Sequence, residues 1–174
     1  SSLDQKKRLL SGLGVDFLVI IEFSPEFAAR EAREFADDLF ATGVKKLSAG
    51  DDWSFGRGRE GNMQRLREWG SESGVEVLEV SAILQDGLRI SSTRIRKCLQ
   101  EEDLDSVATM LGRHYSVLGT VVRGRQLGRT IGFPTANVVV ADEVLPPNGV
   151  YVVEGNGIPG VANIGTRPTV DDSR

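Results

Sequence analysis

The sequence predicts an α/β domain with a parallel sheet, followed by a small antiparallel β domain. Up to about residue 112, apolar runs alternate with segments whose apolar residues recur every three or four positions. This alternation of strands and helices is typical of a Rossmann-like parallel sheet covered by helices. After Gly112, short β-rich runs are separated by Gly, Pro and Asn, which indicates an antiparallel barrel or sandwich. We therefore expect two domains, 1–112 and 113–174.

The first domain is predicted to contain three strands and five helices. Residues 16–23 (DFLVIIEF) form a continuous apolar run, which is typical of a strand buried on both faces. In 31–41, the spacing of Ala32, Phe35, Ala36 and Leu39 predicts a helix with one apolar face. The remaining expected strands are 44–48 and 75–83, and the remaining expected helices are 4–10, 62–69, 92–100 and 104–111.

The second domain is predicted to contain strands at 115–122, 135–140, 149–153 and 161–164. Four strands do not close a barrel. A doubly wound α/β domain normally has a strand and a nucleotide-binding turn ahead of a helix such as 4–10. We therefore expect both domains to be incomplete and the chain to be part of a longer protein.

Composition excludes several classes of function. The chain has 21 Lys and Arg against 25 Asp and Glu, so it lacks the basic surplus of a typical nucleic-acid-binding domain. No apolar run approaches the roughly 20 residues of a membrane helix. Cys98 and His114 are the only residues of their types, which excludes an internal disulfide and a zinc site of Cys and His. We expect a cytoplasmic protein with no membrane or nucleic-acid partner, and the sequence makes no prediction of its oligomeric state.

Residues 128–137 (GRTIGFPTAN) are the most informative segment. Glycines allow a backbone to approach a ligand closely, and proline fixes the path of the chain. Thr135 and Asn137 are two apart in an extended segment, so their oxygens are expected on the same side. Neutral oxygens beside backbone amides suit a hydrated magnesium ion that carries nucleotide phosphates. The segment lacks the residue order of a P-loop, so it would be a different phosphate cradle.

Residues 89–96 (RISSTRIR) open a predicted helix and form a candidate anion site. Ser91 or Ser92 is a natural N-cap, and the first-turn amides lie at the positive end of the helix dipole. The hydroxyls of Ser92 and Thr93, with Arg89 and Arg96, would complete a site for a triphosphate. A well-capped helix with two surface arginines is the alternative interpretation.

Residues 51–59 follow a predicted strand at the carboxyl end, where open α/β sheets bind ligands. Trp53 and Phe55 could flank a flat aromatic ring there. The alternative, which composition favours, is a glycine-rich loop that two aromatic residues anchor in the core. Asp51 and Asp52 are adjacent and expected to point apart, so we do not predict a metal site from them.

Five motifs together give the chain a resemblance to a known family. They are GDDWSFGRGREGN (50–62), RISSTRIR (89–96), GRTIGFPTAN (128–137), PPNGVYVV (146–153) and GVANIGTRPTV (160–170). In this order and at about this spacing, they resemble the bacterial bifunctional riboflavin kinase/FMN adenylyltransferases, also called FAD synthetases. The resemblance covers almost the whole chain. It implies an N-terminal nucleotidyltransferase domain and a C-terminal six-stranded riboflavin kinase barrel.

The resemblance also implies the residues of two sites. For adenylyl transfer it implies ATP contacts from Arg89, Ser91, Ser92, Thr93 and Arg96, and flavin contacts from Asp52, Trp53 and Phe55. For the kinase it implies ATP contacts from Gly124, Arg129, Gly132, Pro134, Thr135 and Asn137, with magnesium held by Thr135 and Asn137. Flavin contacts in the kinase would come from Asn163, Thr166 and Arg167.

Two family features are absent from this sequence. The His-x-Gly-His signature, which stabilises the adenylyl-transfer transition state in the family, is expected ahead of Ser1. The glutamate that serves as general base on riboflavin is expected after Arg174, and Glu154 does not match its motif. No catalytic residue is therefore assigned, and we expect the segment alone to be inactive.

The resemblance implies two successive reactions with Mg²⁺, in which riboflavin and ATP give FMN, and FMN and a second ATP give FAD and pyrophosphate. Two alternatives remain open: a monofunctional enzyme with one working domain, and a non-catalytic flavin- or nucleotide-binding regulator.

Overall fold

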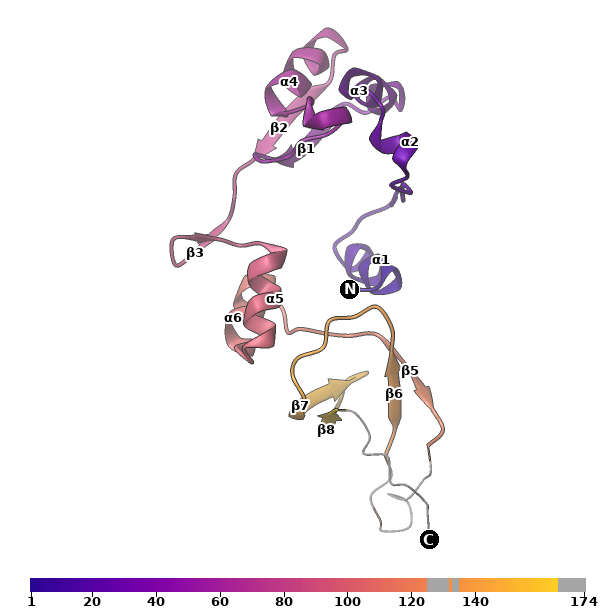
Figure 1. Ribbon diagram of the computed structural model, residues 1–174, viewed down its shortest axis with the longest axis vertical. Helices are drawn as coiled ribbons and strands as arrows, with labels where there is room; N and C mark the ends of the chain where they lie inside the picture. The colour runs from indigo at the N-terminus through magenta and orange to yellow at the C-terminus, as the bar shows by residue number, and fades with distance from the viewer. Residues whose placement is uncertain (125–131, 133–134, 166–174) are drawn as a thin grey trace. The chain divides into compact units, whose positions relative to one another are not determined.

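The computed structural model describes residues 1–124, 132 and 135–165 (Figure 1). The chain divides into two compact units, one from Val19–Arg89 and one from Ser1–Leu18 with the described part of Ile90–Arg174. This division differs from the expected one, because residues 90–112 pack with the second half of the chain. The boundary at residues 112 and 113 stays a prediction.

The Val19–Arg89 unit is built on a parallel pair of strands, as the sequence predicts. Strand β1 (Lys46–Gly50) pairs with β2 (Glu76–Val80), with Lys46 opposite Glu76 and Gly50 opposite Val80. Helix α4 (Met63–Glu72) packs against β2, and helix α3 (Ala32–Ala41) contacts α4 (Figure 1). The two strands run in the same direction, so their carboxyl ends meet at one edge.

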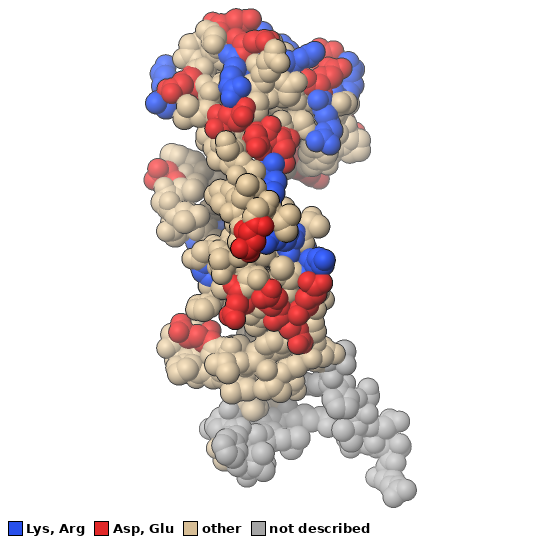
Figure 2. All heavy atoms as spheres, turned by 90° about the vertical axis from the view of Figure 1, so that its left-hand side faces the viewer, with Lys and Arg blue, Asp and Glu red and all other residues tan. Residues whose placement is uncertain are grey.

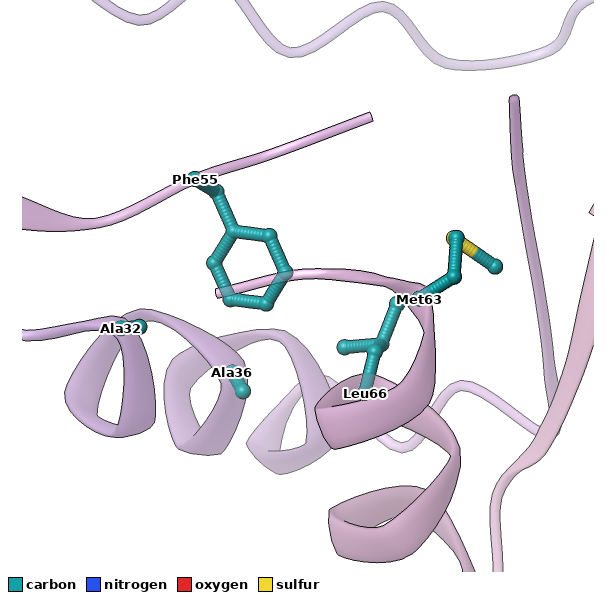
Figure 3. Packing of buried hydrophobic residues seen from close by; sticks show 5 residues of the cluster. All are labelled: Ala32, Ala36, Phe55, Met63 and Leu66. Carbon is teal, nitrogen blue, oxygen red and sulfur yellow. The ribbon is translucent and has the colours of Figure 1, made fainter. Parts of the chain in front are cut away.

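The hydrophobic core of this unit lies between α3, α4 and the loop after β1. Figure 3 shows the Phe55 ring directed toward the two helices. Ala32 and Ala36 carry only a methyl group each, which leaves room for the ring against α3. Leu66 of α4 is fully buried. The expected helices 31–41 and 62–69 are therefore confirmed, each with its apolar face in the core.

The predicted strand at 16–23 is wrong. These residues form no regular structure, and all are exposed, Phe17 to 90%. A strand needs a neighbour for its backbone hydrogen bonds. In the described part of the chain, β1 and β2 pair with each other and no strand lies beside 16–23. An apolar run alone therefore did not determine a strand.

Four short elements of this unit were not predicted. Helix α2 (Pro25–Ala28) starts at the cap Ser24, and the 3₁₀ turn η1 (Arg57–Arg59) lies within the glycine-rich loop. The expected strand 75–83 ends at Val80. It is followed by a hairpin of β3 (Leu84–Gln85) and β4 (Leu88–Arg89). Asp86 and Gly87 both have positive φ, the signature of an Asp-Gly hairpin turn.

The second unit contains three helices. The predicted helix 4–10 is confirmed as α1 (Leu3–Gly12), whose buried Gln5 donates a hydrogen bond to the Ser116 hydroxyl at 2.8 Å. Helices α5 (Ser92–Gln100) and α6 (Leu104–Leu111) have the predicted bounds and pack side by side (Figure 1). Their contact buries Leu99, Val107 and Met110.

The four strands predicted after residue 112 are present. Strand β5 (Gly119–Val122) pairs antiparallel with β6 (Asn137–Val140), and β7 (Gly149–Gly155) pairs antiparallel with β8 (Ile158–Ile164). Among the described residues these remain two separate two-stranded sheets, with no closed barrel. Valines on one face of β7 and β8 are correspondingly exposed, Val152 to 91%.

Candidate functional site

The loop after β1 has a defined backbone path. The Trp53 amide donates to the Gly50 carbonyl at 3.0 Å, which forms a turn immediately after the strand. Phe55 and Gly61 then exchange two backbone hydrogen bonds, at 3.1 and 2.9 Å, and close the loop between them. Trp53 and Phe55 are therefore held at the carboxyl edge of the sheet.

Gly56 fits this path because of its backbone conformation. Its φ of 74° and ψ of 173° lie in a region that is essentially restricted to glycine. A Cβ here would lie 2.5 Å from the Cα of Ala32. The next amide, of Arg57, donates to the Arg30 carbonyl at 2.7 Å. The loop therefore packs directly on the start of α3.

An aromatic cleft of about 280 Å³ opens beside this loop. The Trp53 and Phe55 rings stack with their centroids 4.5 Å apart and their planes at 26°. No ring therefore inserts between them, and the sandwich that the sequence suggested does not occur. Phe55 is a core residue, whereas half-buried Trp53 borders the cleft. The cleft is lined by Phe23, Phe27, Ala28, Arg30, Phe35, Trp53, Ser54, Phe55, Gly56 and Arg59.

Two arginines line the aromatic cleft, and the charge of one of them, Arg30, is balanced by an ion pair. Arg59 Nε donates to the Ser54 hydroxyl at 2.8 Å, and Arg30 Nη2 pairs with Asp38 Oδ2 at 2.7 Å. A flat aromatic ligand that carries an anionic group suits such a cleft, because the rings offer apolar contact and the guanidinium groups attract the anion. Sequence reasoning missed both arginines and also Phe23, Phe27 and Phe35 as lining residues.

Asp51 and Asp52 meet at one guanidinium. Arg89 Nη2 lies 3.0 Å from Asp51 Oδ1 and 2.8 Å from Asp52 Oδ1. The expectation that these two carboxylates point apart is wrong, because they lie in a turn and not on a strand. A hydrogen bond from the Ala82 amide, and then attraction to Arg89, lower the pKa of the Asp51 carboxyl below its ordinary value. Arg89 thus forms ion pairs with two adjacent carboxylates of its own unit.

The start of α5 lies in the other unit and has the predicted cap. Ser91 is the N-cap, with φ of −145° and ψ of 157°, and its hydroxyl accepts a hydrogen bond from the Arg94 amide at 3.2 Å. Ser92, Thr93 and Arg96 are exposed. The first turn contains no acidic residue that would repel an anion. The sequence left the cap open between Ser91 and Ser92, and the structure assigns it to Ser91.

Replacement of the cap separates its structural role from phosphate binding. Ser91→Ala is expected to lower the free energy of unfolding by about 1 kcal/mol, because the Arg94 amide loses its acceptor. Ser91→Asp keeps a good cap and the stability, but its charge opposes a triphosphate. Chemical denaturation and ATP titration of both variants measure the two effects. Equal ATP affinity in Ser91→Asp and the wild type would exclude Ser91 from phosphate contact.

The candidate kinase residues are only partly described. Arg129, Pro134, Thr166 and Arg167 lie outside the described residues. Gly132 has a φ of 82°, and no described residue lies within 4 Å of a Cβ placed there. Thr135 is exposed just ahead of β6, and Asn137 is the first residue of that strand, opposite Val122.

The other two candidates lie elsewhere in this unit. Half-buried Gly124 follows β5, and exposed Asn163 lies on β8. The roles of all these residues stay predictions.

A magnesium ion in this region would rely on neutral oxygens. Within the described residues, no group of three His, Cys, Asp or Glu side chains gathers as it would around a metal ion. The exposed Thr135 hydroxyl and the amide oxygen of Asn137 are donors that Mg²⁺ accepts beside phosphate oxygens and water. The donor set therefore fits a nucleotide-bound ion and not a permanent metal centre.

The distribution of charge and the hydropathy of the helices describe the surroundings of these residues. Figure 2 shows acidic and basic side chains interspersed over the part built by α3, α4, β1 and β2. On this face, no large region of one sign stands out. No helix in the described ranges is long and apolar enough to cross a membrane.

Two family models match the chain in succession. The model of FAD synthetase matches residues 1–94, and that of riboflavin kinase matches residues 111–174. The first match contains both the loop after β1 and the start of α5. The second contains the whole β-rich region.

Individual relatives agree with these matches. Over 97% of this chain, a bifunctional riboflavin kinase/FMN adenylyltransferase of Escherichia coli K12 is 45% identical, and one of Pseudomonas fluorescens is 38% identical. The chain spans 56% of each, about half the length of these curated relatives.

A solved structure shows a similar fold. It is a Streptococcus pneumoniae protein described as a macrolide-efflux protein, with a TM-score of 0.81 and 33% identity over 98% of this chain and 57% of that one. The order of the two matches and the identity to the relatives lead to one conclusion. The chain belongs to the bacterial bifunctional riboflavin kinase/FMN adenylyltransferase family.

Proposed function

We propose that the protein containing this chain converts riboflavin to FMN and FMN to FAD, with ATP as the donor in both steps. The observation that carries the proposal is the succession of an FAD synthetase match and a riboflavin kinase match in one chain. The first step transfers the γ-phosphoryl group of ATP to riboflavin. The second joins FMN to the AMP portion of another ATP and releases pyrophosphate. We further propose a cytoplasmic location.

In the adenylyl transfer, the residues of this chain bind and orient the substrates. In the aromatic cleft, Trp53 would contact the flavin ring of FMN. The arginines that line the cleft would attract the phosphate of FMN. The exposed hydroxyls of Ser92 and Thr93, with Arg96 and the positive end of the α5 dipole, suit the phosphates of ATP. Arg89 is assigned to the same nucleotide. These groups favour charge that builds on the leaving pyrophosphate.

In the kinase step, Thr135 and Asn137 would hold the ion that accompanies ATP. Bound Mg²⁺ would neutralise charge on the transferred phosphoryl group. The exposure of Thr135 is compatible with a nucleotide at this segment. Catalysis would then rest on positioning of the two substrates, with a base that assists the riboflavin hydroxyl.

Arg96→Ala is expected to weaken adenylylation selectively. Loss of a charge-assisted hydrogen bond to phosphate lowers the rate of FAD formation from FMN about 10- to 100-fold, while FMN formation stays unchanged. The assay uses the full-length protein with FMN and ATP. Lys97→Ala is the matched control, because Lys97 is the adjacent exposed cation and pairs with Glu101 at 3.8 Å. An unchanged FAD yield in Arg96→Ala would remove Arg96 from the phosphate site.

The two activities are tested separately by the choice of flavin. Full-length protein with riboflavin and ATP is expected to release ADP first, as FMN forms, and then pyrophosphate, as FMN becomes FAD. With FMN and ATP it is expected to give pyrophosphate and FAD. Release of ADP alone would identify a kinase without adenylyltransferase activity, and pyrophosphate alone the reverse. Bound flavin without either product would identify a regulator.

A further inference from the structure

Asp51 connects three segments at the carboxyl edge of the sheet. It directly follows β1, and its backbone amide donates to the carbonyl of Val80, the last residue of β2, at 3.1 Å. Its Oδ2 accepts a hydrogen bond from the Ala82 amide at 3.3 Å. Its Oδ1 contacts Arg89, the last residue of β4, at 3.0 Å. Asp51 thus joins the two strand ends through its backbone amide, and its side chain connects them to the hairpin that carries Arg89.

The carboxylate of Asp51 differs from that of its neighbour. Asp52 pairs with Arg89, and its side chain is 69% exposed, whereas that of Asp51 is 33% exposed. Asp51 also has the Ala82 amide as a second donor, so its position is set independently of Arg89. Asp51 is the more buried of the two and has two partners, so its carboxylate is the one that can define where the guanidinium lies.

The contacts leave part of the guanidinium for a ligand. Both carboxylates approach Nη2. In the described part of the chain these are the ion-pair partners of Arg89, so the N–H groups of Nη1 and Nε can donate to a phosphate oxygen. Because exposed ion pairs add little to global stability, the geometry of Arg89 is the main consequence of these contacts.

We propose that Asp51 is a positioning residue for adenylyl transfer: it holds Arg89 by Nη2 so that the rest of the guanidinium binds a phosphate of ATP. The proposal rests on the proposed function. It predicts that Asp51 acts through Arg89 and not as a ligand of its own. A long, flexible arginine that is fixed before ATP arrives loses less conformational freedom on binding.

A double-mutant cycle in the full-length protein tests this coupling. The measured quantity is the KM for ATP with FMN as the acceptor, with kcat recorded separately. Arg89→Ala and Asp51→Ala are each expected to raise this KM about tenfold, which corresponds to one charge-assisted hydrogen bond. The double variant is expected to match Arg89→Ala alone, because Asp51 has nothing to position once the guanidinium is gone.

Glu79→Ala is the matched control. Glu79 lies on β2 of the same unit, pairs with Arg67 at 2.7 Å, and its side chain is also 33% exposed. The Glu79→Ala substitution removes an equivalent ion pair and is expected to leave the KM for ATP unchanged. Asp51→Asn, which keeps the size of the side chain, is measured beside Asp51→Ala, with the thermal midpoint of each, so that unfolding is recognised. A raised KM in a folded Asp51→Asn supports the proposal.

Three results would overturn the proposal. They are additive effects of Asp51→Ala and Arg89→Ala, an unchanged KM in the folded Asp51 variants, and tighter ATP binding on loss of Asp51, which would make the carboxylate a competitor for Arg89. If the wild type makes no FAD, the proposed function fails, and equilibrium titration with ATP replaces the KM in the same cycle. Weaker and non-additive affinities there still support positioning, whereas absence of ATP binding to the wild type overturns it.

Discussion

Thr135→Ala and Asn137→Ala, each in the full-length protein, are expected to lower FMN formation about a hundredfold or more and to leave FMN adenylylation mostly intact. Both side chains are assigned to the ion that carries the ATP phosphates in the kinase step. Without them the γ-phosphoryl group is misplaced relative to riboflavin, and small misplacements have large effects on rate. The measurement is the initial rate of each step with its own flavin substrate.

Thr120→Ala provides the control for these variants. Thr120 is an exposed threonine on β5, opposite Val139 of β6. Its replacement by alanine therefore removes a similar hydroxyl from the same small sheet. Both rates are expected to stay near those of the wild type. Equal loss of both steps in Thr135→Ala or Asn137→Ala would refute the division of the two activities between the two regions.

Gly56→Ala is expected to destabilise the Val19–Arg89 unit by about 2–4 kcal/mol, because strain and overpacking act at the same atom. The backbone of Gly56 has a positive φ of 74° with an extended ψ of 173°, and the new methyl group would overlap the Ala32 backbone. Either the loop or α3 must shift, which also disturbs the aromatic cleft. Chemical denaturation, followed by tryptophan fluorescence, measures the loss.

Gly58→Ala separates these two causes. Gly58 also has a positive φ, of 62°, but a Cβ there would meet nothing within 4 Å. Only the backbone cost remains, about 1–2 kcal/mol for a left-handed residue. Similar losses in the two variants would mean that the contact with Ala32 contributes nothing.

Elements with strong local signals were predictable from the sequence. Helices α5 and α6 have the predicted bounds because their ends are set locally, by the cap Ser91 and by Gly112 in the left-handed conformation. The Asn156-Gly157 turn between β7 and β8 was not predicted, although both residues have the positive φ typical of such a hairpin turn. Helix caps and tight turns are determined by residues adjacent in sequence, so a short segment contains the information that specifies them.

Residues 16–23 show where such reasoning stops. Their apolar run is compatible with a buried strand, but a strand forms only if another strand supplies hydrogen-bond partners. That requirement concerns residues distant in sequence, so periodicity contains no information about it. The same limit applies to the barrel, because the strands at 119–122 and 149–155 find only one neighbour each among the described residues.

The candidate site was predictable in part. The motifs identify the loop with Trp53 and Phe55 and the cap at Ser91, because glycines, aromatics and hydroxyl residues are visible in the sequence. Direct stacking of Trp53 on Phe55 is a packing outcome that composition does not encode. The meeting of Asp51 with Arg89 likewise depends on an unpredicted hairpin.

One protein is proposed to perform both flavin reactions in sequence. The most direct measurement is a time course of full-length protein with riboflavin, ATP and Mg²⁺, in which the flavins are separated by chromatography. FMN is expected to form first and then to decline as FAD accumulates. A time course in which riboflavin remains unchanged and neither FMN nor FAD forms would contradict this proposal.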